Sequence, residues 1–385
     1  MTRTLRITYS LSFLGLLVGM GVWSTGALQS FQRTEQMTLL NGKLAKAAET
    51  HYDAEFPIKR LSTNLWAAMD FKLFNEGRPG VVLGRDQWLF SDEEFKPTAG
   101  AEQLMQENLA LIRGVRDTLK QHGSQLVLAI IPAKARIYDE YLGKELPASL
   151  HGDLYNQFHA QARQANVFAP DLMAPLEQAK ARGQVFLRTD THWTPMGAEV
   201  AAQALAEAVN RQQLLNGDPQ TFITEAGKTA PYKGDLTNFL PLDPLFSNLL
   251  PAPDSLQQRT TRPVEAAADA DDALFADKQI PVALVGTSYS ANPHWNFLGA
   301  LQQALRSDVA NYAEDGHGPL LPMLKYLQSD AFESAAPQVV VWEFPERYLP
   351  MKNDLSSFDP QWIAQLKNSH KSEENLALSS TRTNH

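Results

Sequence analysis

The spacing of apolar residues changes period repeatedly along the chain and predicts alternating helices and strands. Segments with apolar residues three or four positions apart are separated by short, nearly continuous apolar runs. The predicted helices are residues 101–123, 153–165, 172–183, 196–212, 295–305 and 319–330. The predicted strands are residues 125–132, 167–170, 184–188, 281–286, 309–313 and 338–345.

Nearly continuous apolar strands between helices are typical of a parallel sheet that is covered on both faces. Cap residues support two of the helix boundaries. Gly123 follows one helix as its C-cap, and Thr194 with Pro195 at N1 opens another. We therefore predict an α/β fold with a mostly parallel sheet and helices on both faces.

We assign this domain to residues 81–363 and expect the other segments to be additions to it. Residues 31–80 have mainly helical spacing. Two short strands within residues 79–95, joined by a Gly-Arg-Asp turn, predict a hairpin. Residues 213–278 are rich in Pro, Asp and Ala, which predicts an irregular insertion with flexible parts such as "VEAAADADDA". Residues 364–385 are polar and predict a flexible tail.

The first 30 residues have the pattern of a secretory signal or a signal anchor. Arg3 and Arg6 precede an apolar run from Ile7 to Trp23, and the segment contains no acidic residue. The basic end is expected to stay in the cytoplasm while the remainder of the chain is exported. We expect an uncleaved anchor in the inner membrane; a cleaved signal peptide and a buried N-terminal helix are the alternatives.

Composition excludes several classes of function. The formal net charge of −9 argues against a general nucleic-acid binder, whose surface should be basic. The chain has no cysteine, which excludes disulfides, thiol catalysis and thiolate metal sites. No dinucleotide fingerprint or phosphate-binding loop occurs, so no cofactor is predicted.

Two predicted strand ends carry residues with catalytic chemistry. Asp190 and His192 follow the run "QVFLR", and Ser288 follows "PVALVG". In an extended segment, residues i and i+2 point to the same side, so Asp190 can orient the imidazole of His192. A serine hydroxyl needs such a base to become a nucleophile. Sites in open α/β sheets lie at the carboxyl ends of strands, where these residues are expected.

Simpler interpretations of these residues remain open at this stage. Ser288 lies in "GTSYS", which matches the nucleophile elbow G-x-S-x-G only in part because Ser290 replaces the final glycine. His192 alone could be an ordinary loop histidine. The Asp-x-His pair could bind a metal, although no third ligand stands at a typical spacing.

Five ordered blocks together resemble the alginate O-acetyltransferases of the J and X type, which are exported proteins with an SGNH-hydrolase-like domain. The blocks are "GRDQWLF", "IIPAKARIY", "RTDTHWTPMGAE", "LVGTSYS" and "VVVWEFPERYL". The J type is the closer match because the chain ends soon after "PERYL", without room for the carbohydrate-binding module of the X type. The resemblance implies a permuted SGNH arrangement, in which Asp190 and His192 precede Ser288.

The resemblance also implies the roles of the three residues: Ser288 accepts the acetyl group, His192 is the base, and Asp190 orients it. Further candidates follow from the needs of acetyl transfer. Oxyanion stabilisation points to the Ser288 N–H, with Arg347 or Tyr348 as a second donor. A uronate chain would suit Lys134 and Arg136, and Trp193 and Tyr289 could exclude water or stack on sugars. For each of these side chains, an ordinary structural role is the alternative.

The expected function is periplasmic O-acetylation of alginate, on its mannuronate residues, through an acetyl-serine intermediate. The resemblance implies three partners: the polysaccharide, a multi-pass membrane acyltransferase that supplies acetyl, and sister periplasmic acetyltransferases. A carbohydrate acetylesterase, an acetyltransferase for another polymer such as cellulose, and a non-catalytic scaffold of the export complex are the alternatives.

Overall fold

The computed structural model describes residues 3–32, 38, 41–144, 146–147, 153–264 and 279–368. The chain divides into two compact units. One contains residues 1–78 and 238–250, and the other contains residues 79–237 and 251–385. The second unit holds the predicted α/β domain.

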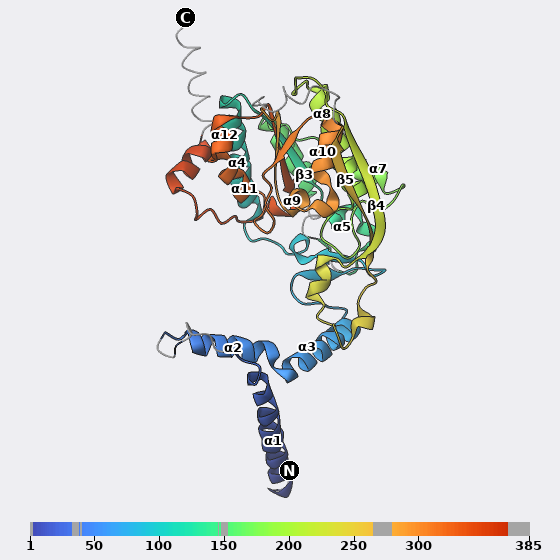
Figure 1. Cartoon of the computed structure of the whole chain (residues 1–385), viewed down its shortest axis with the longest axis vertical. Helices are drawn as coiled ribbons and strands as arrows, with labels where there is room; N and C mark the ends of the chain where they lie inside the picture. The colour runs from blue at the N-terminus through green and yellow to red at the C-terminus, as the bar shows by residue number, and fades with distance from the viewer. Residues whose placement is uncertain are drawn as a thin grey trace, which may run out of the picture. The chain divides into compact units, whose positions relative to one another are not determined.

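The core of the second unit is a four-stranded sheet with the order β3-β8-β6-β7. Figure 1 labels β3, the first strand in this order. Its strands are β3 (Gln125–Ile131), β6 (Val282–Val285), β7 (Val309–Asn311) and β8 (Val339–Pro345), and every pairing is parallel. β3 and β8 are buried along nearly their whole length. The predicted parallel α/β fold is confirmed.

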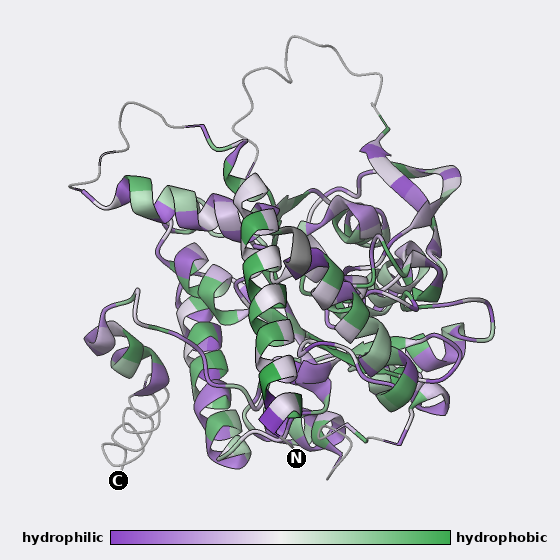
Figure 2. Cartoon of the chain, turned by 90° about the horizontal axis from the view of Figure 1, so that it is seen from below, coloured by the Kyte–Doolittle hydropathy of each residue, from purple (hydrophilic) through white to green (hydrophobic). Residues whose placement is uncertain are grey.

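Helices cover both faces of this sheet, because alternate residues of each strand point to opposite sides. Hydrophobic and hydrophilic residues alternate in bands along the helices (Figure 2), as they do in helices with one apolar side. One face packs against α5 (Lys134–Ile137), α7 (Met173–Ala179), α8 (Pro195–Arg211) and α10 (Phe297–Leu305). The other face packs against α4 (Ala101–Gln121), α6 (Leu154–Gln164), α11 (Leu320–Leu327) and α12 (Asp330–Ser334).

Two predicted strands are not strands of the sheet. Residues 167–170 are irregular, and residues 184–188 contribute only an isolated bridge between Phe186 and Trp193. Both runs are apolar because they are buried against the sheet and its helices; Val185 and Phe186 are fully covered. Burial alone therefore produced the strand-like pattern.

The insertion over residues 213–278 is more regular than predicted. β4 (Phe222–Tyr232) and β5 (Asp254–Pro263) pair as a long antiparallel ribbon with an irregularity between Ala226 and Thr229. Most of their side chains are exposed, so the residues lack the apolar alternation that marks a half-buried strand. The segment "VEAAADADDA" lies almost wholly outside the described residues.

The predicted hairpin is confirmed, with β1 (Val81–Leu83) antiparallel to β2 (Leu89–Ser91). The flexible tail was predicted to begin at residue 364, which is too early in the sequence. Residues 360–368 are helical, and Leu366 is buried against the core. The remainder of that tail lies outside the described residues.

The first unit is mainly helical, as the spacing of residues 31–80 predicted. It contains α1 (Arg3–Ser24), η1 (Thr25–Leu28), α2 (Lys43–Glu55), α3 (Pro57–Met69) and η2 (Asp70–Phe74). Residues 3–28 form a helix that is long and apolar enough to cross a membrane, and most of its surface is exposed. It is a candidate signal anchor.

The first turn of α8 lies so close to the backbone of Val185 that position 197 requires glycine. A Cβ on Gly197 would lie 2.0 Å from the carbonyl oxygen of Val185. We predict that Gly197→Ala lowers the free energy of unfolding by about 1–3 kcal/mol or more, because neither backbone can move freely. Chemical denaturation measures the loss.

Gly183→Ala is the matched control for this prediction. A Cβ there would meet only the flexible end of Met196, 3.3 Å away at its sulfur. An equal loss of stability in both variants would contradict the argument from close approach.

Candidate active site

Ser288 stands at the first residue of α9 (Ser288–Ala291), directly after β6. The turn that presents it rests on a buried carboxylate. Glu343 Oε2 accepts a hydrogen bond from the Thr287 backbone N–H at 2.7 Å and one from the Ser290 hydroxyl at 3.1 Å. The Thr287 hydroxyl also donates to Glu343 at 3.0 Å. Glu343 lies on β8, so the sheet itself fixes the turn.

Position 286 must be glycine for this turn to sit on Glu343. A Cβ on Gly286 would lie 2.5 Å from Glu343 Oε2 and 2.8 Å from its Cβ. Glycine lets the backbone approach β8 closely enough for the carboxylate to reach the Thr287 N–H. Burial raises the pKa of Glu343, and the hydrogen bonds from Thr287 and Ser290 oppose that shift.

His192 lies between Asp190 and Ser288 in a continuous chain of hydrogen bonds. Its Nδ1 is 2.7 Å from Asp190 Oδ1, and its Nε2 is 2.7 Å from the Ser288 hydroxyl oxygen. The same Asp190 oxygen accepts the His192 backbone N–H at 2.9 Å. Asp190 and His192 are buried, whereas Ser288 is partly exposed. The structure therefore brings the three predicted residues together with only the serine open to solvent.

The Asp190 carboxylate is held ionised by several donors. Its Oδ2 accepts the Asp235 backbone N–H at 2.8 Å and the Tyr232 hydroxyl at 3.3 Å. Burial opposes its ionisation, but the hydrogen bond and charge of His192 and the backbone donors outweigh burial and lower its pKa to about 2. An ionised Asp190 favours the His192 tautomer that carries its proton on Nδ1 and leaves Nε2 free to accept from Ser288.

Sequence reasoning missed the acidic residues that shape the Asp190 loop, because they come from the insertion. Asp254 accepts the backbone N–H groups of Arg188 at 2.9 Å and Thr189 at 2.8 Å. Asp235 accepts the Thr191 backbone N–H at 2.8 Å. Asp190, His192 and Asp235 also lie close enough together to hold a metal ion. In this structure, hydrogen bonds to Asp190 and Ser288 engage both ring nitrogens of His192.

Aromatic side chains enclose the His192 ring. Trp295 is nearly parallel to it, with ring centroids 5.0 Å apart and an interplanar angle of 22°. Tyr289 packs at 4.7 Å and donates its hydroxyl to the Thr191 carbonyl at 2.7 Å. The position of Trp295 limits how far the imidazole can rotate.

The two cations predicted to bind a uronate are occupied within the protein. Lys134 is 1% exposed, and its ammonium donates to the carbonyl oxygens of Leu89 at 2.6 Å, Asp190 at 2.8 Å and Arg188 at 3.0 Å. Arg136 is largely buried and makes a hydrogen-bonded ion pair with Glu346 at 2.6 Å. Neither offers a free charge to a polymer, so that prediction was wrong.

The two aromatic residues predicted to stack on sugars are core residues. Trp193 is fully buried and packs against Tyr289 and Phe297. Tyr289 is 2% exposed and supports His192 from within. They exclude water from one side of His192, but sugar rings cannot reach their faces.

The contacts of Arg347 are to a sequence neighbour of Ser288, to Tyr348 and to Glu93. The side chain of Arg347 is buried, and its Nε donates to Glu93 at 2.8 Å. Its Cζ lies 5.7 Å from the ring centroid of Tyr289 and 4.8 Å from the ring centroid of Tyr348. Arg347 therefore contacts Tyr289, the residue that follows Ser288 in the sequence. A role for Arg347 or Tyr348 as oxyanion donor remains a prediction.

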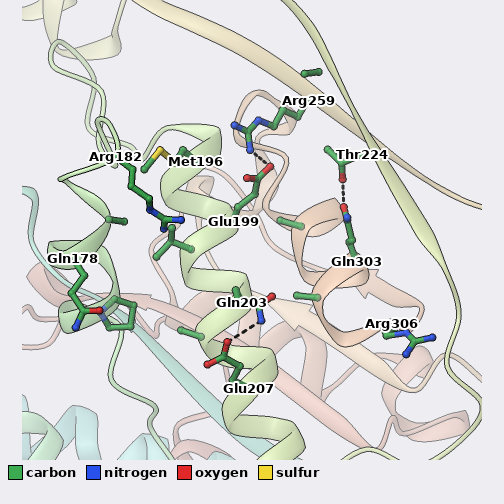
Figure 3. A pocket seen from close by; sticks show the side chains of 17 residues that line it. Gln178, Arg182, Met196, Glu199, Gln203, Glu207, Thr224, Arg259, Gln303 and Arg306 are labelled. Carbon is green, nitrogen blue, oxygen red and sulfur yellow. Dashed lines mark hydrogen bonds and ion pairs between the residues drawn. The ribbon is translucent and has the colours of Figure 1, made fainter.

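A cavity of about 1070 Å³ lies apart from these three residues, among α7, α8, α10 and the β4–β5 ribbon (Figure 3). Glu199 pairs with Arg259 across it, and Gln203 donates to Glu207 on its wall. None of Asp190, His192 and Ser288 lines it. The candidate site is therefore separate from this cavity.

Comparisons with known proteins agree with the fold. A family model described as "SGNH hydrolase-like domain, acetyltransferase AlgX" matches residues 81–346. "Probable alginate O-acetylase AlgJ" of Pseudomonas putida is 94% identical over 385 residues, which covers 100% of both chains. The protein of the same name from Pseudomonas aeruginosa is 56% identical over 384 residues and 98% of each chain. The resemblance predicted from five sequence blocks is confirmed.

A solved structure is also similar to this chain. The "O-Acetyltransferase Domain of Pseudomonas putida AlgJ" superposes with a TM-score of 0.71 and 89% sequence identity. The match covers 76% of this chain and 100% of that one. It supports both the SGNH-like fold and an acetyltransferase activity.

The carboxylate beneath the nucleophile turn gives a prediction about stability. Glu343→Leu leaves the Thr287 N–H and two hydroxyl groups buried without their acceptor, so we expect a loss of at least about 2 kcal/mol in the free energy of unfolding. Glu343→Gln, which keeps one carbonyl oxygen, should lose less. Urea denaturation compares them with the exposed control Glu102→Leu. An unchanged Glu343→Leu variant would show that the turn does not depend on this carboxylate.

The lowered pKa of Asp190 gives a prediction about pH. Between about pH 4 and pH 2, the unfolded state takes up a proton at this residue before the folded state does. The stabilisation by Asp190 is therefore complete above about pH 4 and is lost as the pH falls through 2. The unfolding free energy of the wild type should fall more steeply in this range than that of Asp190→Asn. If the unfolding free energies of the two proteins changed equally with pH, Asp190 would not be ionised more readily in the folded state than in the unfolded state.

Proposed function

The chain belongs to the SGNH hydrolase-like acetyltransferase family represented by AlgX and AlgJ, and on that premise we propose that it O-acetylates alginate through an acetyl group carried on Ser288. The observation that carries the assignment of the nucleophile is the chain of two 2.7 Å hydrogen bonds from Asp190 through His192 to Ser288.

In the first half-reaction, Ser288 Oγ attacks the carbonyl carbon of an acetyl donor while its proton moves to His192 Nε2. The tetrahedral oxyanion accepts a hydrogen bond from the Ser288 backbone N–H. When the intermediate collapses, the bond to the donor breaks and His192 returns the proton to the leaving group. Acetyl-Ser288 remains. Asp190 stays ionised and stabilises the imidazolium that forms in between.

In the second half-reaction, a hydroxyl group of a mannuronate residue attacks the acetyl-Ser288 carbonyl. Its proton passes to His192 Nε2, and the acetyl–serine bond breaks as Ser288 recovers a proton from His192. Water can replace the sugar hydroxyl, and the product is then free acetate. Transfer and hydrolysis therefore use the same residues and differ only in which hydroxyl reaches Ser288.

The location and partners follow from the same premise. We infer that α1 anchors the chain in the inner membrane with its basic end in the cytoplasm, and that the catalytic unit acts in the periplasm. A multi-pass membrane acyltransferase would supply acetyl groups from the cytoplasm, and sister acetyltransferases would share the polymer. The relatives' names, which specify alginate, support the choice of polysaccharide.

The test is to incubate the full-length protein with an acetyl ester and a mannuronate oligomer, and to follow both by mass spectrometry. We expect acetylated oligomer, and a brief quench should leave one acetyl group on the peptide that contains Ser288. Ser288→Ala should lower transfer by at least about 10³-fold, because the nucleophile is lost. The exposed control Ser356→Ala should keep full activity.

Two outcomes would contradict the proposal in different ways. Transfer at an unchanged rate in Ser288→Ala would show that another group carries the acetyl. Free acetate as the sole product, with oligomer in excess, would assign the chain as an esterase.

A further inference from the structure

Helix α3 exposes a row of large apolar side chains. Leu61, Leu65 and Met69 are 48%, 48% and 38% exposed, and Leu73 in η2 is 68% exposed. These residues are four positions apart, so they form one ridge along the helix. Asn64, in contrast, is 3% exposed. In a water-soluble domain, an amphipathic helix usually turns such a row toward the core.

The orientation of α3 is fixed by contacts within its own unit. The Asn64 side-chain amide donates to the Pro241 carbonyl at 2.6 Å, and Ala68, one turn later, is also buried. The segment 238–250, which belongs to this unit, thus holds the face of α3 that carries Asn64. The apolar ridge points away from that face, so rotation of the helix to cover it would break the buried hydrogen bond.

Trp66 and Phe74 enlarge the exposed apolar surface, at 65% and 64% exposure. Apolar patches of this kind on soluble proteins mark a surface that contacts something else. Elsewhere in the described chain, large exposed apolar side chains gather in α1 and η1, whereas the remaining ones are scattered. The two clusters lie in the same unit, and α1 and α3 are in contact. The ridge is therefore next to the candidate membrane span.

The residues around the ridge match a lipid surface better than a water-filled groove or a protein pocket. Arg60 and Lys72 stand beside it in the sequence, and Trp66 is exposed on the same helix. Long cationic side chains reach phosphate head groups while their stems stay apolar, and tryptophan prefers the boundary between head groups and acyl chains. A helix of this composition typically lies in the plane of the membrane surface.

We propose that α3 and η2 form an interfacial helix in the leaflet at the carboxyl end of α1. The ridge from Leu61 to Leu73 lies among the upper acyl chains, and Arg60 and Lys72 contact the phosphates. The first unit then holds the membrane twice, by a span and by a surface helix. This lipid contact goes beyond acetyl transfer and is independent of the chemistry at Ser288.

The absence of cysteine from the chain permits a direct test, because a single introduced cysteine can be labelled specifically. An environment-sensitive fluorophore is attached to the full-length protein at Leu65→Cys or Leu61→Cys, both at exposed positions that should tolerate the change. Glu49→Cys on α2 is the aqueous control, and Leu14→Cys on α1 is the membrane control. Each variant is placed in vesicles of phosphatidylcholine and phosphatidylglycerol.

We expect the labels at Leu65 and Leu61 to be quenched by lipids with a nitroxide near the head group, and to be at least about threefold less accessible to aqueous iodide than the label at Glu49. Iodide quenching equal to that at Glu49 would overturn the proposal, since the ridge would then face water. Protection from both quenchers would also overturn it, because a second copy of the chain would cover the ridge. Iodide quenching at Leu14 equal to that at Glu49 would contradict the anchor assigned to α1, independently of the acetyltransferase activity.

Discussion

The arrangement of the candidate active site depends on the hydrogen bonds of one buried group, the ammonium of Lys134. Lys134 follows the end of β3, and its ammonium donates to three carbonyl oxygens from two segments: Leu89 in the hairpin, and Arg188 and Asp190 in the loop that leads to His192. Burial lowers its pKa to about 8, although the nearby carboxylates of Glu94 and Asp190 oppose that shift. Burying an unpaired ammonium would cost several kcal/mol, so these carbonyl groups are held where they satisfy it.

The two halves of the site are supported in the same way, by buried ionisable side chains that hydrogen-bond to irregular backbone. Lys134 and Asp254 fix the loop before His192, through carbonyl oxygens and N–H groups respectively. Glu343 fixes the turn before Ser288 through N–H and hydroxyl donors. Asp254 lies on β5 and Glu343 lies on β8, while Lys134 is hydrogen-bonded to Leu89 in the hairpin. The distance between His192 and Ser288 is therefore set by the rigid core and not by flexible loops.

Much of the fold could be predicted from the sequence, because buried parallel strands and capped helices leave strong local patterns. Asp190, His192 and Ser288 were identified because they follow apolar runs and match a known arrangement of blocks. The acidic residues that support these three could not be identified in this way. Asp254 and Asp235 belong to a ribbon whose exposed strands have no apolar alternation, and Glu343 looks like an ordinary interruption of an apolar strand. The functions predicted for Lys134 and Arg136 failed because a sequence does not show that both cations are already paired.

The central claim is that Asp190, His192 and Ser288 act as a single unit, and the kinetics of a double variant tests it most directly. Transfer of acetyl to a mannuronate oligomer is measured for Ser288→Ala, His192→Ala and the variant with both changes. Residues that act as one unit have strongly non-additive effects. The account predicts that the double variant is no slower than the slower single variant. Losses that multiply would contradict it, because the serine and the histidine would then contribute to separate steps.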